Sequence, residues 1–174
     1  MLVAERAVTL GRPISVGLIS DTHGLLRPEA IAALTGSDFI VHAGDIGSPD
    51  VLAGLSRLAP VTAIRGNVDR GPWASALPDN EVLQAGAAFV FVIHNIADID
   101  LDPAAAGFRV VVSGHSHQPG WREKDGVLFV NPGSAGPRRF KLPVSVGRLS
   151  VTDAGITVDM VEFARLDLNV SQTE

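Results

Sequence analysis

The sequence contains no cysteine, which excludes disulfides, thiolate metal sites and cysteine nucleophiles. Any metal ion in this protein must therefore be held by oxygen and imidazole nitrogen atoms. Aromatic residues make up only 5% of the chain, so the hydrophobic core must be built from Val, Ile, Leu and Ala. No serine lies in a Gly-x-Ser-x-Gly motif, so the usual nucleophilic serine of a hydrolase elbow is missing as well.

Long apolar runs are also absent. No stretch reaches the roughly eighteen apolar residues that a membrane-spanning helix needs. Glu5 and Arg6 lie where a signal peptide would have its apolar core, so a cytoplasmic protein without membrane contact is expected. The net charge of −5 gives no support to nucleic-acid binding.

The chain of 174 residues is long enough for one domain with a substantial core and too short to expect two. We expect the core of this domain to span about residues 14–163. Residues 1–13 are expected to form an extra edge strand or a loose arm, and residues 164–174 a peripheral tail.

The order of elements predicts an α/β fold. Strands and helices alternate in the first part, which implies parallel strands joined by crossover helices. Strands are expected there at 14–19, 38–43 and 61–65, and helices at 28–34 and after the cap formed by Ser48 and Pro49. A loop over 70–79, further strands and one short helix follow, at 81–85, 88–93, a helix from Asp102, 109–113, and hairpins 120–123/127–130 and 144–151/156–163. The two parts together predict mixed sheets with helices outside.

Polar side chains follow the apolar strands at the points where these strands end. The run ISVGLISDTH ends in Asp21 and His23, which would point the same way in an extended backbone. Four of the five histidines occupy such strand ends, together with two aspartates and one asparagine; the set is Asp21, His23, Asp45, Asn67, His94, His115 and His117. Since carboxyl ends of strands in open α/β sheets bind ligands, a shared metal site is expected there.

Two further features accompany this set. Glycine precedes Asp45, Asn67 and His115, which leaves room for close backbone approach. His42 lies inside the second strand, where a hydrogen-bonded role in the core or behind the ligands is favoured over a ligand role.

Over about residues 14–163 the sequence contains, in this order, Asp-x-His, Gly-Asp, Gly-Asn-x-Asp, a single His and Gly-His-x-His. This series of motifs resembles the calcineurin-like metallophosphoesterase superfamily. The short length and the Asn131–Ser134 loop are similar to its small, single-domain YfcE-like phosphodiesterase branch. The resemblance implies a four-layer α/β/β/α sandwich of two mixed sheets flanked by helices.

The same resemblance implies a dinuclear metal centre. Asp21, His23 and His117 would hold the first ion, and Asp45 would bridge to the second, which the remaining ligands Asn67, His94 and His115 would hold. Asp45, Asn67 and His94 are also the residues expected to act in catalysis. Mn²⁺ is the first expectation for both ions, and Fe, Zn or Ni are alternatives.

Two such ions would activate a bridging hydroxide for in-line attack on phosphorus, without a protein nucleophile. The favoured activity is a phosphodiesterase on small, nucleotide-like phosphoesters. A phosphomonoesterase or nucleotidase is the alternative within enzymes, and a protein-interaction module like the retromer subunit of this fold is the alternative outside them. A homo-oligomer is compatible with the sequence.

The motifs depart from the superfamily pattern at three positions. Val68 stands where the superfamily has a histidine near the leaving group, so a general acid is missing and Asp69 lacks its imidazole partner. Asn95 replaces a glycine, and a turn with positive φ is expected to survive there. Ile96 replaces another histidine and removes a second candidate acid.

Several charged and aromatic residues could have either a substrate-binding or a structural role. Arg138, Arg139 and Lys141 would either contact substrate phosphate or be solvated loop charges, with the second slightly favoured. Trp73 and Trp121 would stack on a nucleobase, although packing under its loop or at a subunit contact is favoured for Trp73. Asn131 and Ser134 are expected to shape the loop beside the metals and not to be ligands.

Overall fold

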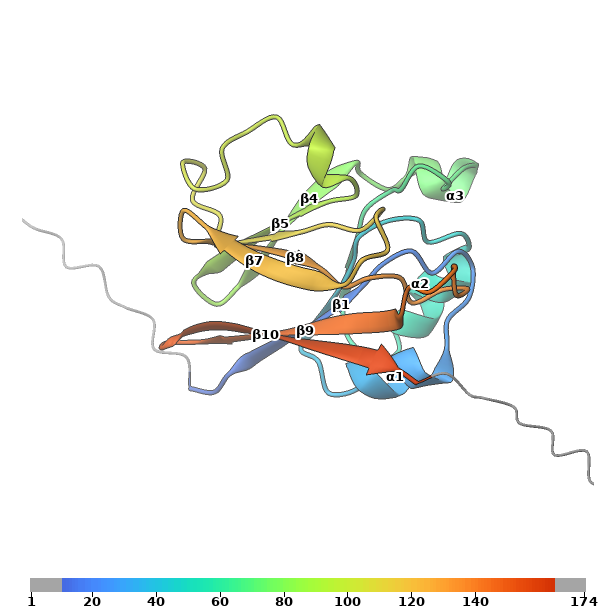
Figure 1. The fold of residues 1–174 in the computed structure, drawn as a ribbon, viewed down its shortest axis with the longest axis horizontal. Coiled ribbons are helices and arrows are strands. Elements are labelled where there is room, and N and C mark those ends of the chain that lie inside the picture. The colour runs from blue at the N-terminus through green and yellow to red at the C-terminus, as the bar shows by residue number, and fades with distance from the viewer. Residues whose placement is uncertain (1–10, 165–174) are drawn as a thin grey trace, which may run out of the picture.

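Two five-stranded sheets form the centre of the molecule in a computed structural model that describes residues 11–164 (Figure 1). The first sheet has the strand order β10-β9-β1-β2-β3 and the second the order β4-β5-β6-β8-β7. The strands are β1 (Ile14–Ile19), β2 (Phe39–His42), β3 (Val61–Ala63), β4 (Asn80–Ala85), β5 (Ala88–Ile93), β6 (Val110–Val112), β7 (Gly120–Lys124), β8 (Val127–Asn131), β9 (Val144–Thr152) and β10 (Gly155–Phe163). The helices are α1 (Pro28–Leu34), α2 (Pro49–Leu55), α3 (Pro72–Ser75) and the 3₁₀ helix η1 (Ile96–Asp98).

Both sheets are mixed. In the first sheet β1, β2 and β3 run parallel and are joined through α1 and α2, while the antiparallel hairpin β9–β10 adds to the other side of β1. In the second sheet β5, β6 and β8 run parallel, with β4 and β7 antiparallel at the edges. The alternating strands and helices of the first part of the chain therefore form parallel crossovers, as their order predicts.

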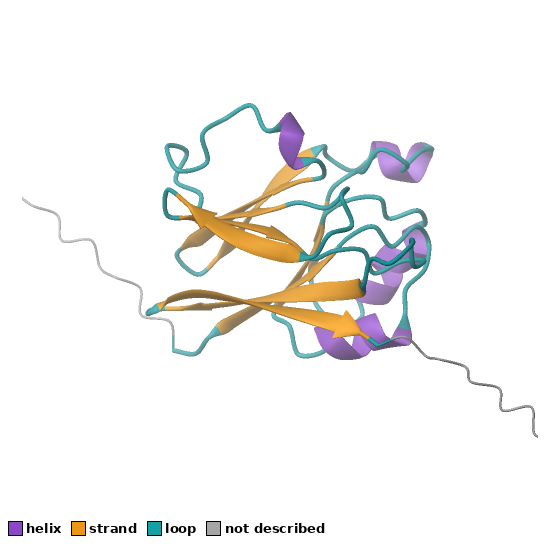
Figure 2. Ribbon diagram, in the orientation of Figure 1, coloured by secondary structure: helices purple, strands orange, loops and turns teal. Residues whose placement is uncertain are grey.

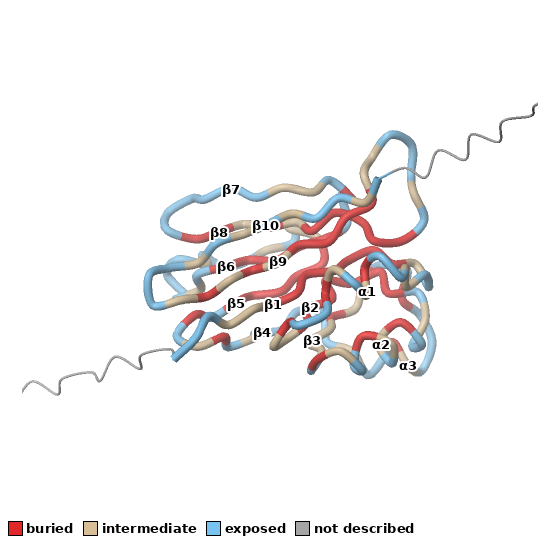
Figure 3. Tube along the Cα trace, turned by 90° about the horizontal axis from the view of Figure 1, so that it is seen from below, coloured by how far each residue is buried: buried red, intermediate tan, exposed pale blue. Residues whose placement is uncertain are grey.

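Three apolar clusters define four layers. The inner faces of the two sheets pack together through residues such as Leu18 and Val92, both fully buried. The outer face of the first sheet packs on α1 and α2, where Leu34 is buried. The outer face of the second sheet is covered by η1 and its loop, through Ile99 and Phe108. Figure 3 shows the buried residues concentrated along the strands. The expected α/β/β/α fold is confirmed, with a thin fourth layer.

Local sequence explains most element boundaries. Ser48 accepts a hydrogen bond from the Asp50 amide at the start of α2, and proline occupies the first turn there, as the sequence predicts. The helix expected from Asp102 is wrong: the segment forms hydrogen-bonded turns, with Asp102 Oδ1 accepting from the amides of Ala104 and Ala105. The 70–79 loop contains the single-turn helix α3, which the prediction missed because Gly71 and Pro72 read as loop residues.

Most of the expected N-terminal arm and nearly all of the tail lie outside the described residues. Within residues 11–164 no helix is long and apolar enough to cross a membrane. The loops that leave the carboxyl ends of β1, β2 and β3 gather with α1, α2 and α3 at one end of the sheets (Figure 2). That end is where the candidate ligands lie.

Candidate metal centre

Two groups of side chains at the strand ends are close enough to bind metal ions. Ligand atoms of Asp21, His23 and His117 all lie within 4.8 Å of one another. Ligand atoms of Asp21, Asp45 and His94 satisfy the same limit. The two groups share Asp21, so they are neighbouring parts of one cluster.

The first group is built around the buried carboxylate of Asp21. Its Oδ2 accepts hydrogen bonds from Ser20 Oγ (2.6 Å) and the His115 amide (3.1 Å). Its Oδ1 lies 3.1 Å from His117 Nε2, yet it is buried and has no hydrogen-bond partner. The His23 and His117 rings lie 5.5 Å apart between centroids. An oxygen and a nitrogen that approach without a hydrogen bond are arranged as two ligands of a common third atom would be.

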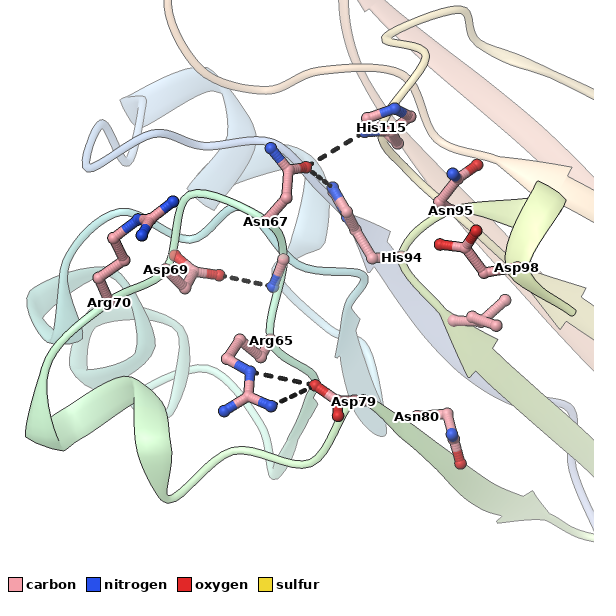
Figure 4. A pocket seen from close by; sticks show the side chains of 12 residues that line it. Arg65, Asn67, Asp69, Arg70, Asp79, Asn80, His94, Asn95, Asp98 and His115 are labelled. Carbon is pink, nitrogen blue, oxygen red and sulfur yellow. Dashed lines mark hydrogen bonds and ion pairs between the residues drawn. The ribbon is translucent and has the colours of Figure 1, made fainter.

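The amide oxygen of Asn67 lies beside the second group and joins its His94 to His115 (Figure 4). Asn67 Oδ1 lies 3.0 Å from His94 Nε2 and 3.2 Å from His115 Nδ1. On the other side of its ring, His94 Nδ1 lies 2.7 Å from the Ala43 carbonyl oxygen, which only accepts hydrogen bonds, so Nδ1 carries the proton. In a neutral His94 the lone pair of Nε2 therefore points at oxygen atoms, and a proton or a cation is needed between them.

Asp45 is the second carboxylate of the second group. Its Oδ1 accepts a hydrogen bond from the Val68 amide (3.0 Å) and lies 3.4 Å from His94 Nε2. Burial opposes ionisation of Asp45, but the contacts from His94 and the Val68 amide outweigh it and hold the pKa of Asp45 below its usual value. Burial likewise opposes protonation of His94, yet Asp45 and the Ala43 carbonyl raise the pKa of His94.

Burial dominates the electrostatics of the first group. It raises the pKa of Asp21, against the hydrogen bond from Ser20 and the nearby imidazoles of His94 and His117. It also lowers the pKa of His117, despite the neighbouring Asp21 carboxylate. A cation in this group would supply the charge compensation that these buried side chains lack.

The backbone is strained at the candidate ligands. Within residues 11–164, seven residues other than glycine have positive φ, and five of them are candidate ligands: Asp21, His23, Asp45, His115 and His117. Residues other than glycine rarely adopt this backbone conformation, and residues with strained backbones cluster at functional sites. The expectation of an extended backbone at Asp21 and His23 is therefore wrong, because each turns through the left-handed region, although the two side chains still converge on one group as expected.

Close backbone packing explains the glycines before the ligands. A Cβ atom on Gly66 would overlap the amide nitrogen and Oδ1 of Asp45. A Cβ atom on Gly114 would overlap Ser20 Oγ and lie 2.6 Å from Asp21 Oδ2. The close approach that the sequence predicts is thus present, and it links loops from different strands.

Two residues behind the ligands hold these loops in place. Asp69 accepts three backbone hydrogen bonds, from Ile46 (3.1 Å), Gly47 (2.8 Å) and Gly66 (2.8 Å), and so it ties the loop after β2 to the loop after β3. Within the described residues Asp69 has no imidazole partner, as Val68 implies, but these three backbone amides satisfy it instead. The sequence offered no signal for this role, because the three amides come from distant segments. Ser134 donates to the Asp21 carbonyl (2.9 Å), in line with its expected role in shaping the site.

A cavity of about 630 Å³ opens beside the second group. Its lining includes Asn67, His94 and His115 together with Arg65 and Arg70 (Figure 4). Arg65 is engaged by Asp79, at 3.0 Å from Nε and 2.5 Å from Nη2. Within residues 11–164, Arg70 makes no hydrogen bond or ion pair, so its guanidinium is available to an anionic ligand.

Asn95 and His42 have roles that the structure decides. Asn95 has φ −108°, so the expected turn with positive φ is wrong; its side chain accepts from the Ala97 amide and caps η1. His42 is fully buried, and its Nε2 lies 2.9 Å from Thr22 Oγ1, which confirms a hydrogen-bonded core position.

The charged and aromatic residues divide between structural and exposed positions. Arg138 donates to the carbonyls of Leu142 and Phe163, so it supports the loop. Trp73 packs in the apolar cluster below its loop, whereas 55% of Trp121 is exposed.

Comparisons with known proteins agree on one family. The model of the calcineurin-like phosphoesterase superfamily domain matches residues 14–154. A protein named "Probable metallophosphoesterase" from Methanothermobacter thermautotrophicus is 33% identical over 170 residues, covering 91% of this chain and 92% of the relative.

Two solved structures share the fold at lower identity. An archaeal phosphodiesterase superposes with a TM-score of 0.73 at 23% identity, covering 86% of this chain and 100% of that one. Vacuolar protein sorting 29 from Cryptosporidium parvum superposes with a TM-score of 0.70 at 21% identity, covering 88% and 100%. The fold is therefore common to a named phosphodiesterase and to a named sorting protein.

Proposed function

The chain belongs to the calcineurin-like phosphoesterase superfamily, and from this premise we propose that it is a phosphodiesterase that uses two divalent metal ions. The observation that carries the proposal is the convergence of two sets of oxygen and nitrogen ligands around Asp21 and Asp45. One set alone would suit a single ion, whereas two adjoining sets suit the paired ions of phosphoryl-transfer sites.

In this proposal each set holds one ion. Asp21, His23 and His117 bind the first ion, and Asp45 bridges both. The second ion would lie at the other set, where Asn67 and His115 join His94 as its ligands. Asp45, Asn67 and His94 thereby belong to the catalytic centre.

The donor atoms fit such ions. Asp21 Oδ1 is buried without a hydrogen bond, and His94 Nε2 faces Asn67 Oδ1 and Asp45 Oδ1. Carboxylate, amide oxygen and imidazole suit Mn²⁺, Fe²⁺, Zn²⁺ or Ni²⁺, and Mn²⁺ is our first choice. When bound, the ions activate water and neutralise charge on the phosphate oxygens.

The chain's own residues position the reaction. The Ala43 carbonyl fixes the tautomer and ring plane of His94, as partners behind a metal ligand commonly do. The Val68 amide orients Asp45 in the same way. Arg70 at the cavity wall is placed to bind a phosphate oxygen of the substrate.

Two observations favour a diester substrate. The cavity of about 630 Å³ beside the second set leaves room for a substituent on phosphorus. The archaeal phosphodiesterase with the same fold supports the same choice by analogy. A small phosphoester with polar substituents fits the polar lining, which includes Asn80, Asn95 and Asp98.

The test combines metal analysis with hydrolysis. We expect purified protein reloaded with Mn²⁺ to contain two ions per chain and to hydrolyse bis-p-nitrophenyl phosphate faster than p-nitrophenyl phosphate. Chelation should abolish both reactions, and an Asp21→Ala variant should lose the first ion. A protein that binds two ions but hydrolyses neither ester would favour the interaction-module role instead.

A further inference from the structure

Phe140 occupies a position in the loop between β8 and β9 that packing does not explain. Its side chain is 91% exposed, and its φ is 52°. The Leu142 amide donates to the Arg139 carbonyl (3.1 Å) and closes a tight turn in which Phe140 is the second residue. Positive φ at this position favours glycine, and a bulky residue there is a strained exception. Phenylalanine at position 140 therefore stabilises the fold neither through a favourable backbone conformation nor through burial of its apolar side chain.

The base of this turn is held firmly. Arg138 donates to the carbonyls of Leu142 (3.2 Å) and Phe163 (3.3 Å). Earlier in the loop, the Ala135 amide donates to the Ser20 carbonyl (3.0 Å), and Arg27 donates from two nitrogens to the Gly136 carbonyl (both 3.2 Å). The exposed phenylalanine is therefore presented on an anchored turn.

The turn lies beside the first set of candidate ligands. Arg139 Nη2 is 3.5 Å from His23 Nε2, and a Cβ atom on Gly136 would lie 2.5 Å from the carbonyl oxygens of Asp21 and Thr22. In Figure 1 this orange loop follows β8 and reaches the end of the sheets where the chain leaves β1. The Arg139 guanidinium thus adjoins the first set of ligands, and the exposed Phe140 follows it directly in the same turn.

This pairing matches the chemistry of a nucleotide. An exposed phenyl ring offers an apolar face on which a nucleobase stacks, and such stacking tolerates any base because every base has a π-face. The neighbouring Arg139 guanidinium suits the phosphate of the same molecule. The cavity near Arg70 is lined by His94 and not by Arg139 or Phe140, so it remains available for the second substituent of a diester.

We propose that Phe140 is a specificity-determining residue that stacks on the nucleobase of the substrate, so that the enzyme prefers nucleotide diesters to alkyl diesters. The proposal rests on the phosphodiesterase function proposed above. The strained backbone then has a function, because it holds the ring in position before the substrate binds.

The experiment compares two diesters with the same leaving group, thymidine 5′-p-nitrophenyl phosphate and methyl p-nitrophenyl phosphate. In the Mn²⁺-loaded wild type, we expect kcat/KM to be higher for the thymidine ester. In Phe140→Gly, the ratio of the two kcat/KM values should fall about tenfold, mainly through KM, because stacking on one base is lost. By calorimetry, the ratio of the Kd of thymidine 5′-monophosphate to that of inorganic phosphate should rise by a similar factor.

Controls separate stacking from damage to the fold. Phe140→Gly should melt no lower than the wild type, since glycine accepts the positive φ, and Phe140→Asn provides a second tolerant variant. Phe89→Ala removes another exposed phenylalanine, 42% accessible at the far end of β5, and should leave both ratios unchanged.

The outcomes distinguish the two proposals. If Phe140→Gly hydrolyses both esters with the kcat/KM values of the wild type, the stacking role is overturned and the proposed function stands. An equal loss on both esters would place the shared nitrophenyl group against Phe140 and overturn the nucleobase assignment. If the loaded wild type hydrolyses neither ester, the proposed function fails and this inference fails with it.

Discussion

Individual residues carry the chemistry through atoms that are left without ordinary partners. Asp21 Oδ1 is buried without a hydrogen bond, and the lone pair of His94 Nε2 faces two oxygens once Nδ1 donates to Ala43. Buried polar groups without partners are costly and usually have a functional explanation. At this scale Asp45 and Val68 can be tested singly.

Replacing Asp45 by asparagine should harm the centre more than truncating Asn67. A carboxylate shared between two cations cannot be replaced by a neutral amide without weakening both sites, whereas Asn67 serves one. We expect Asp45→Asn to lose more than about 100-fold in kcat/KM, beyond what a residue behind the ligands contributes. The measurement is kcat/KM with metal content for both variants, and an Asp45→Asn enzyme with two ions and normal turnover would refute the bridge.

The rate of the wild type should depend steeply on the pKa of the leaving group. Val68 is 42% exposed beside Asp45 and cannot protonate a departing alkoxide. A positioned acid typically contributes about 10²- to 10⁴-fold, so aryl esters should be cleaved far faster than alkyl esters. A series of aryl and alkyl diesters measures the slope, and a shallow slope in the wild type would reveal another acid.

Val68→His should flatten this dependence, mainly by helping poor leaving groups. The gain should be modest, about tenfold, because three backbone amides already occupy most of the acceptor sites of Asp69 and leave little capacity to orient the new imidazole. Val68→Gln, of similar size but without a titrating group, is the control. An equal change in slope in both variants would mean that only the shape of the side chain matters.

At the scale of elements, the strand ends are the strained parts of the fold. Five ligand residues have positive φ, and at about 1–2 kcal/mol each their strain is on the order of 5–10 kcal/mol. That sum rivals the whole stability of a typical domain, about 5–15 kcal/mol. The loops after β1, β2 and β6 therefore keep this conformation because hydrogen bonds between loops impose it, such as those of Asp69 to the loop after β2 and of the His115 amide to Asp21.

Removing the Asp69 carboxylate should loosen two loops at once. Asp69→Ala leaves the amides of Ile46, Gly47 and Gly66 without their partner, and each unsatisfied amide costs about 1–3 kcal/mol. We expect a loss of at least about 3 kcal/mol in the free energy of unfolding by urea, with weaker metal binding. Asp79→Ala is the matched control, because it removes an exposed ion pair with Arg65 worth about 0–1 kcal/mol. Equal losses in the two variants would contradict the clamp.

At the scale of the whole molecule, the core also limits stability in acid. Thr22 Oγ1 donates to the Ile46 carbonyl (2.9 Å), so it must accept the hydrogen bond from His42 Nε2. His42 Nδ1 is then buried without a partner, and burial lowers the pKa of His42 to about 3. The imidazole is neutral in the folded protein and gains a proton on unfolding below about pH 6.5.

Stability should therefore fall as the pH drops from about 6.5 towards 3. The unfolded state binds the proton first, so each step downward in pH favours unfolding, and the penalty levels off only near the folded pKa. His42→Gln keeps a donor for Thr22 and lacks this titration. Urea unfolding of metal-free protein at pH 7 and pH 4 should show a smaller loss for His42→Gln, by a few kcal/mol. Parallel losses would mean that other groups govern acid unfolding.

The sequence by itself determined the order of the strands along the chain, the two crossover helices α1 and α2, and the identities of the candidate ligands. Periodicity, capping residues such as Ser48, and polar residues after apolar runs are local signals, and local signals suffice for these features. The motif order also pointed to the family that the comparisons show for residues 14–154. The expected helix at Asp102 failed because its signal was a cap without a long apolar face behind it.

Only the tertiary structure decided how the ligands are held. The left-handed backbone at Asp21 and His23, the three amides on Asp69 and the exposure of Phe140 depend on segments far apart in the chain. No local pattern encodes such contacts, because their energies arise when loops from several strands meet at one end of two sheets. The residue types that can bind a metal are written in the sequence, whereas their geometry is a property of the packed molecule.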